Sequence, residues 1–175
     1  TLKRKDGCNM IALTVKSLKV FMNSLLISDT FDHFLVSEAS ITTFTTFSID
    51  GILHPDFYGS DISDKLQESD RSQVFWKEIK AYCFSVIKGK HTPLSFKFVL
   101  QLPKEEAEKL IMKSYLNIEK QDLFGLFLNC QYNGETLTLT TGTSLRVFTL
   151  DKSLDEALDQ MLKAFLAERN IDVDE

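Results

Sequence analysis

The chain has little glycine, proline or cysteine, with seven Gly, three Pro and three Cys in 175 residues. So few Gly and Pro residues argue against long disordered linkers. The cysteines are Cys8, Cys83 and Cys130; their number is odd and they lack CxxC spacing. Because Cys83 and Cys130 lie in apolar patterns, we expect reduced, buried thiols and an intracellular, cytoplasmic protein.

Long apolar runs and common catalytic motifs are also missing. No apolar run approaches the roughly 18 residues of a membrane span, and the amino-terminal residues lack the apolar region of a signal peptide. GxSxG, P-loop, GxGxxG and HExxH motifs are absent. These absences remove the common signatures of hydrolases, nucleotide-binding proteins and zinc enzymes, so we expect no cofactor, no metal and no membrane partner.

An excess of positive charge is absent too. The 20 basic and 25 acidic residues give a net charge of −5, so no global field draws the chain to nucleic acid or anionic lipid. Hydrophobic residues make up 43% and charged residues 26%, as in an ordinary globular domain with its own core. Phenylalanine is abundant, with fourteen residues, which favours a β-containing core; the alternative is a stacking surface.

The first nine residues differ from the rest of the chain. They are polar and without pattern, whereas the strand-like "MIALTV" begins at Met10. Codons for Lys5, Asp6 and Gly7 can spell a ribosome-binding sequence just upstream of the Met10 codon. We therefore expect residues 1–9 to be a non-native or disordered leader.

Periodicity predicts alternating strands and helices in the first half. Ser17 is a good N-cap for a helix with one apolar stripe. The stretch "ITTFTTFSI" suits a strand on which Phe44, Phe47 and Ile49 bury one face, with a bulge where alternation breaks between 44 and 47. The predicted elements are a strand at 11–15, a helix at 18–28, strands at 33–39 and 41–49, a polar connector at 54–70 with room for one short turn of helix, and a helix at 72–87.

The second half carries clearer signals. Residues 94–102 alternate strictly, Pro103 opens a helix, and Asn133-Gly134 is typical of a tight hairpin. Ser153 and Glu156 match a capping box before a strong apolar stripe. The predicted elements are strands at 94–102, 124–132, 137–139 and 145–150, and helices at 104–116 and 153–169.

The order strand, helix, strand, strand therefore occurs twice. We predict an α+β fold of two β-α-β-β repeats that form antiparallel sheets with helices packed on one side. The predicted single domain spans 10–170 and comprises repeat one at 11–53, a connecting helix at 72–88, repeat two at 94–150 and a C-terminal helix at 153–169.

Two resemblances accompany this pattern. "SFKFVLQLPKEEAEKL" and "LFLNCQYNGETLTLTT" look like the strand, helix and hairpin of a DNA sliding-clamp domain, which implies a clamp-like arrangement. "MIAL", "DTFDHFLVSEASITTFTTFSIDG" and "KGKHTPLSFKFVL" resemble an uncharacterised domain-of-unknown-function family of Gram-positive bacterial proteins. That resemblance implies no activity, substrate or catalytic residue.

A cationic group with interleaved aromatic residues is one candidate site. Lysine and arginine neutralise phosphates while aromatic rings stack on bases, as in sequence-tolerant nucleic-acid binding. A solvated helix face explains the same residues. The candidate nucleic-acid contacts are Arg71, Lys77, Lys80, Lys88 and Lys90.

The histidines define an alternative ligand or metal site. His33 stands beside a strand next to Asp32, and His54 shares a loop with Asp56, but two ligands in one loop are too few for a metal site. The alternative site comprises Asp32, His33, His54 and Asp56.

These observations favour a non-enzymatic cytosolic binding or assembly module over an enzyme. Its expected partner is an unknown protein or a second copy in a dimer, with nucleic acid a further possibility. The alternative is an enzyme or a small-molecule or metal-binding protein with its site near His33 and His54.

Overall fold

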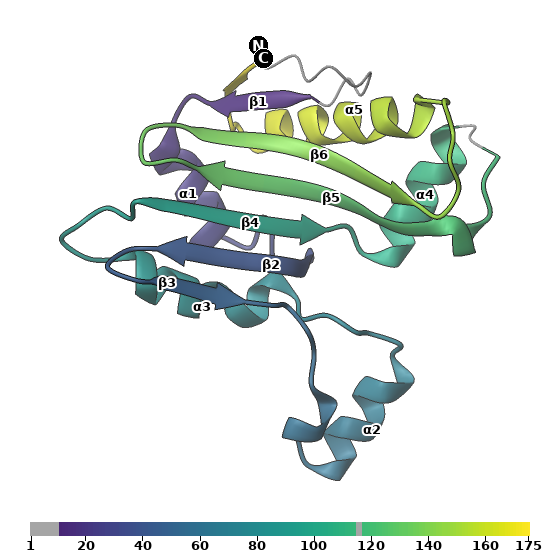
Figure 1. Cartoon of the computed structure of the whole chain (residues 1–175), viewed down its shortest axis with the longest axis horizontal. Coiled ribbons are helices and arrows are strands. Elements are labelled where there is room, and N and C mark those ends of the chain that lie inside the picture. Colours follow the sequence, from purple (N-terminus) through teal and green to yellow (C-terminus); the bar gives the residue numbers. More distant parts are fainter. Residues whose placement is uncertain (1–10, 115–116) are drawn as a thin grey trace.

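The structure, a computed structural model, describes residues 11–114 and 117–175. Its centre is a seven-stranded antiparallel sheet in the order β3-β2-β4-β5-β6-β1-β7 (Figure 1). The predictions about residues 1–9 and a start at Met10 lie outside the described residues. The strands are β1 Ala12–Val15, β2 Leu35–Thr42, β3 Thr46–Ile49, β4 Ser95–Gln101, β5 Leu123–Tyr132, β6 Leu137–Leu145 and β7 Val173–Asp174.

Apart from α2 (Ser60–Glu68), which stands away from the sheet, the helices cover one face of this sheet (Figure 1). Alternation in β4 explains the layering, because Phe96, Phe98 and Leu100 are buried while the residues between them are only half-buried. The helices are α1 Leu18–Leu26, α2 Ser60–Glu68, α3 Trp76–Ile87, α4 Lys104–Ser114 and α5 Ser153–Glu168, with the short 3-10 turns η1 Pro55–Phe57 and η2 Lys120–Asp122.

The predicted α+β class, with an antiparallel sheet and helices on one side, is confirmed. Each half has the predicted element order, β1-α1-β2-β3 and β4-α4-β5-β6. The two units are not paired equivalently, because β4 neighbours β5 of its own unit whereas β1 pairs with β6 and β7. All strands form one sheet, and the resemblance to a sliding clamp stays a prediction.

The hairpin β2–β3 differs from its prediction. β2 runs through Ser40 without a break, and the chain turns at residues 43–45, where the Thr43 N–H donates to the Thr45 oxygen at 2.9 Å. The irregularity lies in β2, between Val36 and Glu38. The prediction that Phe44 and Phe47 are buried is wrong: Phe44 lies at the turn with 91% of its surface exposed, and Phe47 on β3 is exposed as well.

Two segments between β3 and β4 also differ from the prediction. The polar connector contains a nine-residue helix, α2, which begins after Gly59. The helix predicted from Ser72 begins only at Trp76, because residues 72–75 are extended and bond to the sheet and its neighbours. The Val36 N–H donates to the Val74 oxygen at 2.9 Å, and Ile52 forms a bridge with Gln73.

Near the carboxyl end, the strand predicted at 145–150 is not formed. β6 ends at Leu145, the Arg146 N–H donates to the Asp122 oxygen at 2.7 Å, and Phe148 is exposed. The capping box is also wrong, because Lys152 occupies the N-cap of α5 without a side-chain cap. The strand at the end of the chain is β7, which pairs with β1.

The fourteen phenylalanines divide between interior and surface. Five are buried in the core between sheet and helices, which agrees with a β-containing core. Five others are exposed, which is more than the core interpretation predicts. The buried rings are Phe21, Phe31, Phe34, Phe96 and Phe98, and the exposed rings are Phe44, Phe47, Phe57, Phe124 and Phe148.

Candidate functional site

Two of the predicted cationic residues are held in ion pairs within the chain. Arg71 donates to both carboxylate oxygens of Glu78, at 2.7 and 3.3 Å. Lys80 donates to Asp32 Oδ1 at 2.5 Å and to the Ser28 oxygen at 2.9 Å. Charge-assisted bonds of this kind must be broken before either cation can neutralise a phosphate.

The carboxylate of Glu78 shows how strongly the first pair is held. Burial raises the pKa of the Glu78 carboxyl, but hydrogen bonds from the Arg71 guanidinium and the Phe75 N–H outweigh burial and leave that pKa below its ordinary value. Glu78 therefore stays ionised and keeps Arg71 on the protein surface beside α3.

The other three predicted cations have looser surroundings. The Lys77 ammonium lies 5.5 Å from the centre of the Phe75 ring, and the Lys88 ammonium lies 5.7 Å from that of Phe84. Lys90 lines a cavity described below. Of the five candidates, only Lys90 lines that cavity.

The alternative site divides into two parts. Asp32 and His33 line a cleft of about 190 Å³ together with Phe75 and Lys77, and His33 Nε2 lies 3.4 Å from Glu106 Oε1. His54 and Asp56 do not line this cleft; they belong to the start of η1. Within residues 11–114 and 117–175, no three His, Cys, Asp or Glu residues come together in a way that could hold a metal ion.

The cysteines offer no activated nucleophile in the part of the chain that is described. Both Cys83 and Cys130 are buried and unpaired, as the sequence predicted. Burial raises the pKa of the Cys83 thiol to about 11 and raises that of Cys130 further still. A thiol with so high a pKa carries almost no thiolate at neutral pH.

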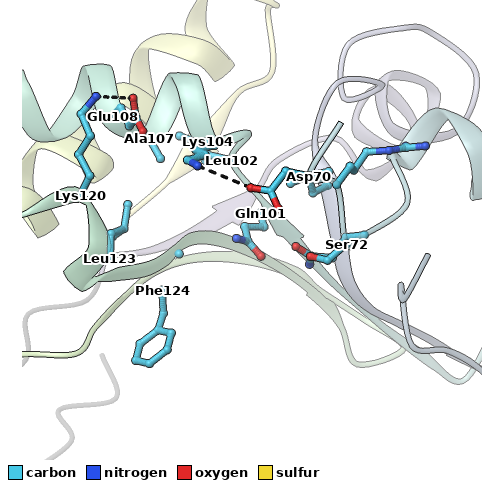
Figure 2. Close-up of a pocket in the computed structure, with 14 residues that line it drawn as sticks. Asp70, Ser72, Gln101, Leu102, Lys104, Ala107, Glu108, Lys120, Leu123 and Phe124 are labelled. Atoms are coloured by element: carbon cyan, nitrogen blue, oxygen red, sulfur yellow. Dashed lines mark hydrogen bonds and ion pairs between the residues drawn. The ribbon is translucent and has the colours of Figure 1, made fainter. Parts of the chain in front are cut away.

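A polar cleft of about 220 Å³ lies between the start of α4, the end of β4 and the loop before α3 (Figure 2). Its ionic side chains are all paired within the chain: Lys120 with Glu108 at 2.8 Å, Lys104 with Asp70 at 4.0 Å, and Arg71 with Glu78, which lies outside the lining. Gln101 points toward the middle of the cleft, while the Phe124 ring points away from the charged groups (Figure 2). Because each charged side chain of this cleft already has an ion-pair partner in the chain, the cleft does not favour a charged ligand.

An apolar groove of about 600 Å³, larger than the two clefts above, lies at the end of the sheet where the β2–β3 turn meets the connection from α3 to β4 (Figure 1). We call it the turn groove. It is lined by residues from three segments, the turn 43–47, the end of α3 and the stretch 89–94. The side chains that define it are Phe44, Phe47, Val86, Lys90, His91 and Leu94.

Local hydrogen bonds hold the turn groove open. The Leu94 N–H donates to the Thr42 oxygen at 2.9 Å, and the Thr42 and Thr46 hydroxyls lie 3.0 Å apart across the turn. The rings of Phe44 and Phe47 meet edge to face, with centroids 5.9 Å apart. The two rings therefore support each other while Phe44 remains in water.

The charge of the turn groove is opposite in sign to that of the whole chain. Lys90 and His91 line it, and no carboxylate does, although the chain carries a net charge of −5. The sequence pointed to Lys90, but Phe44 and Phe47 were placed on a buried strand face. Their spacing of three, which breaks strand alternation, was the signal of a turn.

No helix among the described residues combines the length and hydrophobicity needed to cross a membrane. Comparison with curated proteins and with solved structures yields no match to this chain. The profile of a family described as "Family of unknown function (DUF5721)" matches residues 24–174. This confirms the predicted likeness to a family without an assigned activity, and the chain belongs to the DUF5721 family of unknown function.

Proposed function

We propose that this chain is a non-enzymatic binding module that docks an acidic protein segment with aromatic or aliphatic side chains in the turn groove. The observation that carries the proposal is the groove itself: about 600 Å³, walled by Phe44, Phe47 and Leu94, with basic and no acidic lining residues. Contiguous apolar hollows rimmed by polar groups are typical of interaction sites.

The exposed rings supply a driving force for docking. Phe44 is 91% exposed and Leu94 is 67% exposed. Fully burying a side chain of this kind is favourable by about 1.5–3 kcal/mol. A partner that covers these two residues therefore gains the free energy of burying both side chains, and an aromatic ring such as that of Phe44 contributes strongly at an interface.

The basic residues favour an acidic partner. Lys90 and His91 line the groove, and none of its lining residues is a carboxylate. A carboxylate of the partner can therefore pair with Lys90 without competing with an acidic residue of the groove. Complementary charges raise the association rate and select the partner more than they raise affinity. Binding of a nucleic acid is less favourable, because Arg71 and Lys80 already form ion pairs with Glu78 and Asp32.

The cytosol is the proposed compartment. Cys83 and Cys130 are unpaired and buried, and free structural thiols of this kind are typical of proteins in reducing surroundings.

The proposal is tested with a dansyl-labelled synthetic peptide of alternating glutamate and phenylalanine, titrated with the full chain and followed by fluorescence anisotropy. We expect saturable binding that Phe44→Ser or Lys90→Glu weakens by about fivefold or more. Phe148→Ser is the matched control, because Phe148 is 90% exposed but does not line the groove; it should leave the affinity unchanged.

An oligothymidylate probe separates the protein partner from a nucleic acid. If the oligonucleotide binds in place of the peptide, with an affinity that collapses with salt and with Lys77→Glu and Lys88→Glu, the module binds nucleic acid and the proposal is wrong. Peptide binding that is equal in Phe44→Ser and the wild-type chain would show that the turn groove is not the site.

A further inference from the structure

Residues 54–70, here called the arm, project from the body of the protein (Figure 1). α2 packs mainly on η1 and lies away from the sheet. Its apolar side chains have little to cover them: Phe57 is 85% exposed, Ile62 is 52% exposed, and the Phe57 and Tyr58 rings contact each other edge to face. A helix with an uncovered apolar side is typical of a segment that binds another surface.

The arm is also acidic. It contains five carboxylates, Asp56, Asp61, Asp64, Glu68 and Asp70, against one cation, Lys65. The arm thus supplies the carboxylates that the lining of the turn groove lacks, and like the groove it carries exposed aromatic and aliphatic side chains. Arm and groove are complementary in charge and alike in apolar character.

The arm of one molecule is poorly placed to fill its own groove. The groove is built on the turn 43–45 that precedes β3, and the arm leaves the chain after β3 and Gly51. The two therefore lie at opposite ends of β3 (Figure 1), and a four-residue strand separates its ends by about 13 Å.

β3 is a short strand at one edge of the sheet. Among the described strands it pairs only with β2. Charged side chains and proline on an edge strand commonly prevent edge-to-edge pairing. The sequence of β3, TFSI, contains neither. Thr46, Phe47 and Ser48 are exposed along it.

We propose that the occupant of the turn groove is the arm of a second copy of this chain, in a two-fold dimer whose β3 edges pair antiparallel. Antiparallel pairing sets the arm end of one β3 beside the groove end of the other, so each arm reaches the partner's groove and both contacts form at once. This inference rests on the proposed function of the groove, and it names the partner.

Charge reversal in the full chain tests the inference by sedimentation equilibrium. We expect the wild-type chain to dimerise, with about tenfold or more weakening in Lys90→Glu and in the double variant Asp61→Lys, Asp64→Lys, because each creates like-charge contacts in both halves of its homodimer. Phe57→Ser should weaken the dimer too. Phe148→Ser, whose side chain lies outside groove and arm, should not.

An equimolar mixture of Lys90→Glu with Asp61→Lys, Asp64→Lys is the decisive measurement. Only the mixed dimer brings the native acidic arm to the native basic groove and the reversed arm to the reversed groove, so the mixture should dimerise more tightly than either variant alone. All substituted positions are exposed, and circular dichroism spectra verify that each variant is folded.

Two results would overturn the inference. One is a wild-type chain that remains monomeric at about 100 µM; if that monomer still binds the glutamate–phenylalanine peptide through Phe44, the proposed function stands and only the second copy is excluded. The other is a dimer that is indifferent to arm and groove substitutions and shows no preference for the mixed pair.

Discussion

The indole Nε1–H of Trp76 donates a hydrogen bond of 2.6 Å to the main-chain oxygen of Leu25, the two groups being buried where α3 meets the end of α1. Trp76 has no exposed surface, and its ring lies 5.1 Å from that of Phe98 on β4. One side chain therefore joins two helices to the middle of the sheet. The same helix, α3, contributes Val86 to the wall of the turn groove.

Trp76→Phe is expected to destabilise the protein by about 3 kcal/mol, because it leaves the Leu25 oxygen without a donor and opens a cavity beside Phe98. Urea denaturation followed by circular dichroism measures the change. Tyr82→Phe on the same helix is the control; Tyr82 is 70% exposed, so its loss should alter the free energy of unfolding by no more than about 0.5 kcal/mol. Equal effects of the two changes would contradict the role assigned to Trp76.

Gly51→Ala is expected to destabilise the junction between β3 and the arm by about 2 kcal/mol or more. Gly51 has a φ of +73°, and an added Cβ would meet the Val36 oxygen at 2.1 Å. Gly89→Ala adds a Cβ that meets nothing within 4 Å, and its φ is not in the left-handed region. Thermal unfolding of both variants compares their stabilities. If Gly51→Ala were as stable as Gly89→Ala, the positive φ of Gly51 and its close approach to the Val36 oxygen would be contradicted.

The free energy of unfolding should depend on pH in the acidic range through the carboxyl group of Asp159 on α5. Burial raises the pKa of its carboxyl; the Thr141 hydroxyl, which donates to Asp159 Oδ1 at 2.5 Å, lowers it, and neighbouring Asp155 raises it again. The folded state therefore holds this proton more tightly than the unfolded state does. The contribution of this group to stability is present below its ordinary pKa of 3.8 and is lost as pH rises through the raised folded pKa.

Asp159→Asn removes this proton linkage, so stability measured by urea denaturation across the acidic range should fall less with rising pH than in the wild-type chain. Asp151 gives the opposite sign, since the hydrogen bond of 2.8 Å from the Ser153 main-chain N–H holds the pKa of its carboxyl below the ordinary value. Its stabilising contribution is present above 3.8 and is lost as pH falls. Parallel pH profiles for the Asp159→Asn and wild-type chains would show that the predicted linkage is absent.

Thiol reactivity should be very low in the folded chain. In a Cys8→Ser variant, which retains only Cys83 and Cys130, Ellman's reagent at neutral pH should react at least about a hundredfold more slowly than with free cysteine. Both thiols are buried, and burial raises their pKa values. Adding urea to the unfolding range should release two fast-reacting thiols, and fast reaction before urea is added would contradict the burial of these residues.

Local sequence signals predicted those elements whose partners are close by or whose pattern is strong. The strict alternation of 94–102 became β4, and Asn133-Gly134 became the β5–β6 turn, with Gly134 at φ +97°. Ser17 caps α1 as expected, since its hydroxyl accepts from the Val20 N–H at 3.4 Å. These features depend on a few neighbouring residues, so the chain alone specifies them.

The candidate site was far less predictable. The sequence indicates Lys90 as a possible contact, but its pattern predicts a strand at Phe44 and a polar connector where α2 forms. Whether Phe44 is buried depends on where the β2–β3 hairpin turns, which is decided by the pairing of β2 with β4. The strand expected at 145–150 failed for a related reason: beyond Leu145 the chain bonds to Asp122 and no partner strand continues beside it.

The α+β class, the element order within each β-α-β-β unit, the buried thiols and the net negative charge could be derived from the amino-acid sequence alone, because they follow from composition, periodicity and local turn chemistry. Only the tertiary structure decided that β3 is an edge, that Phe44 and Leu94 share a groove with Lys90, and that the arm stands apart from the sheet. Those features depend on which distant segments pair with each other. The pattern of side chains along one strand does not specify which other strand pairs with it.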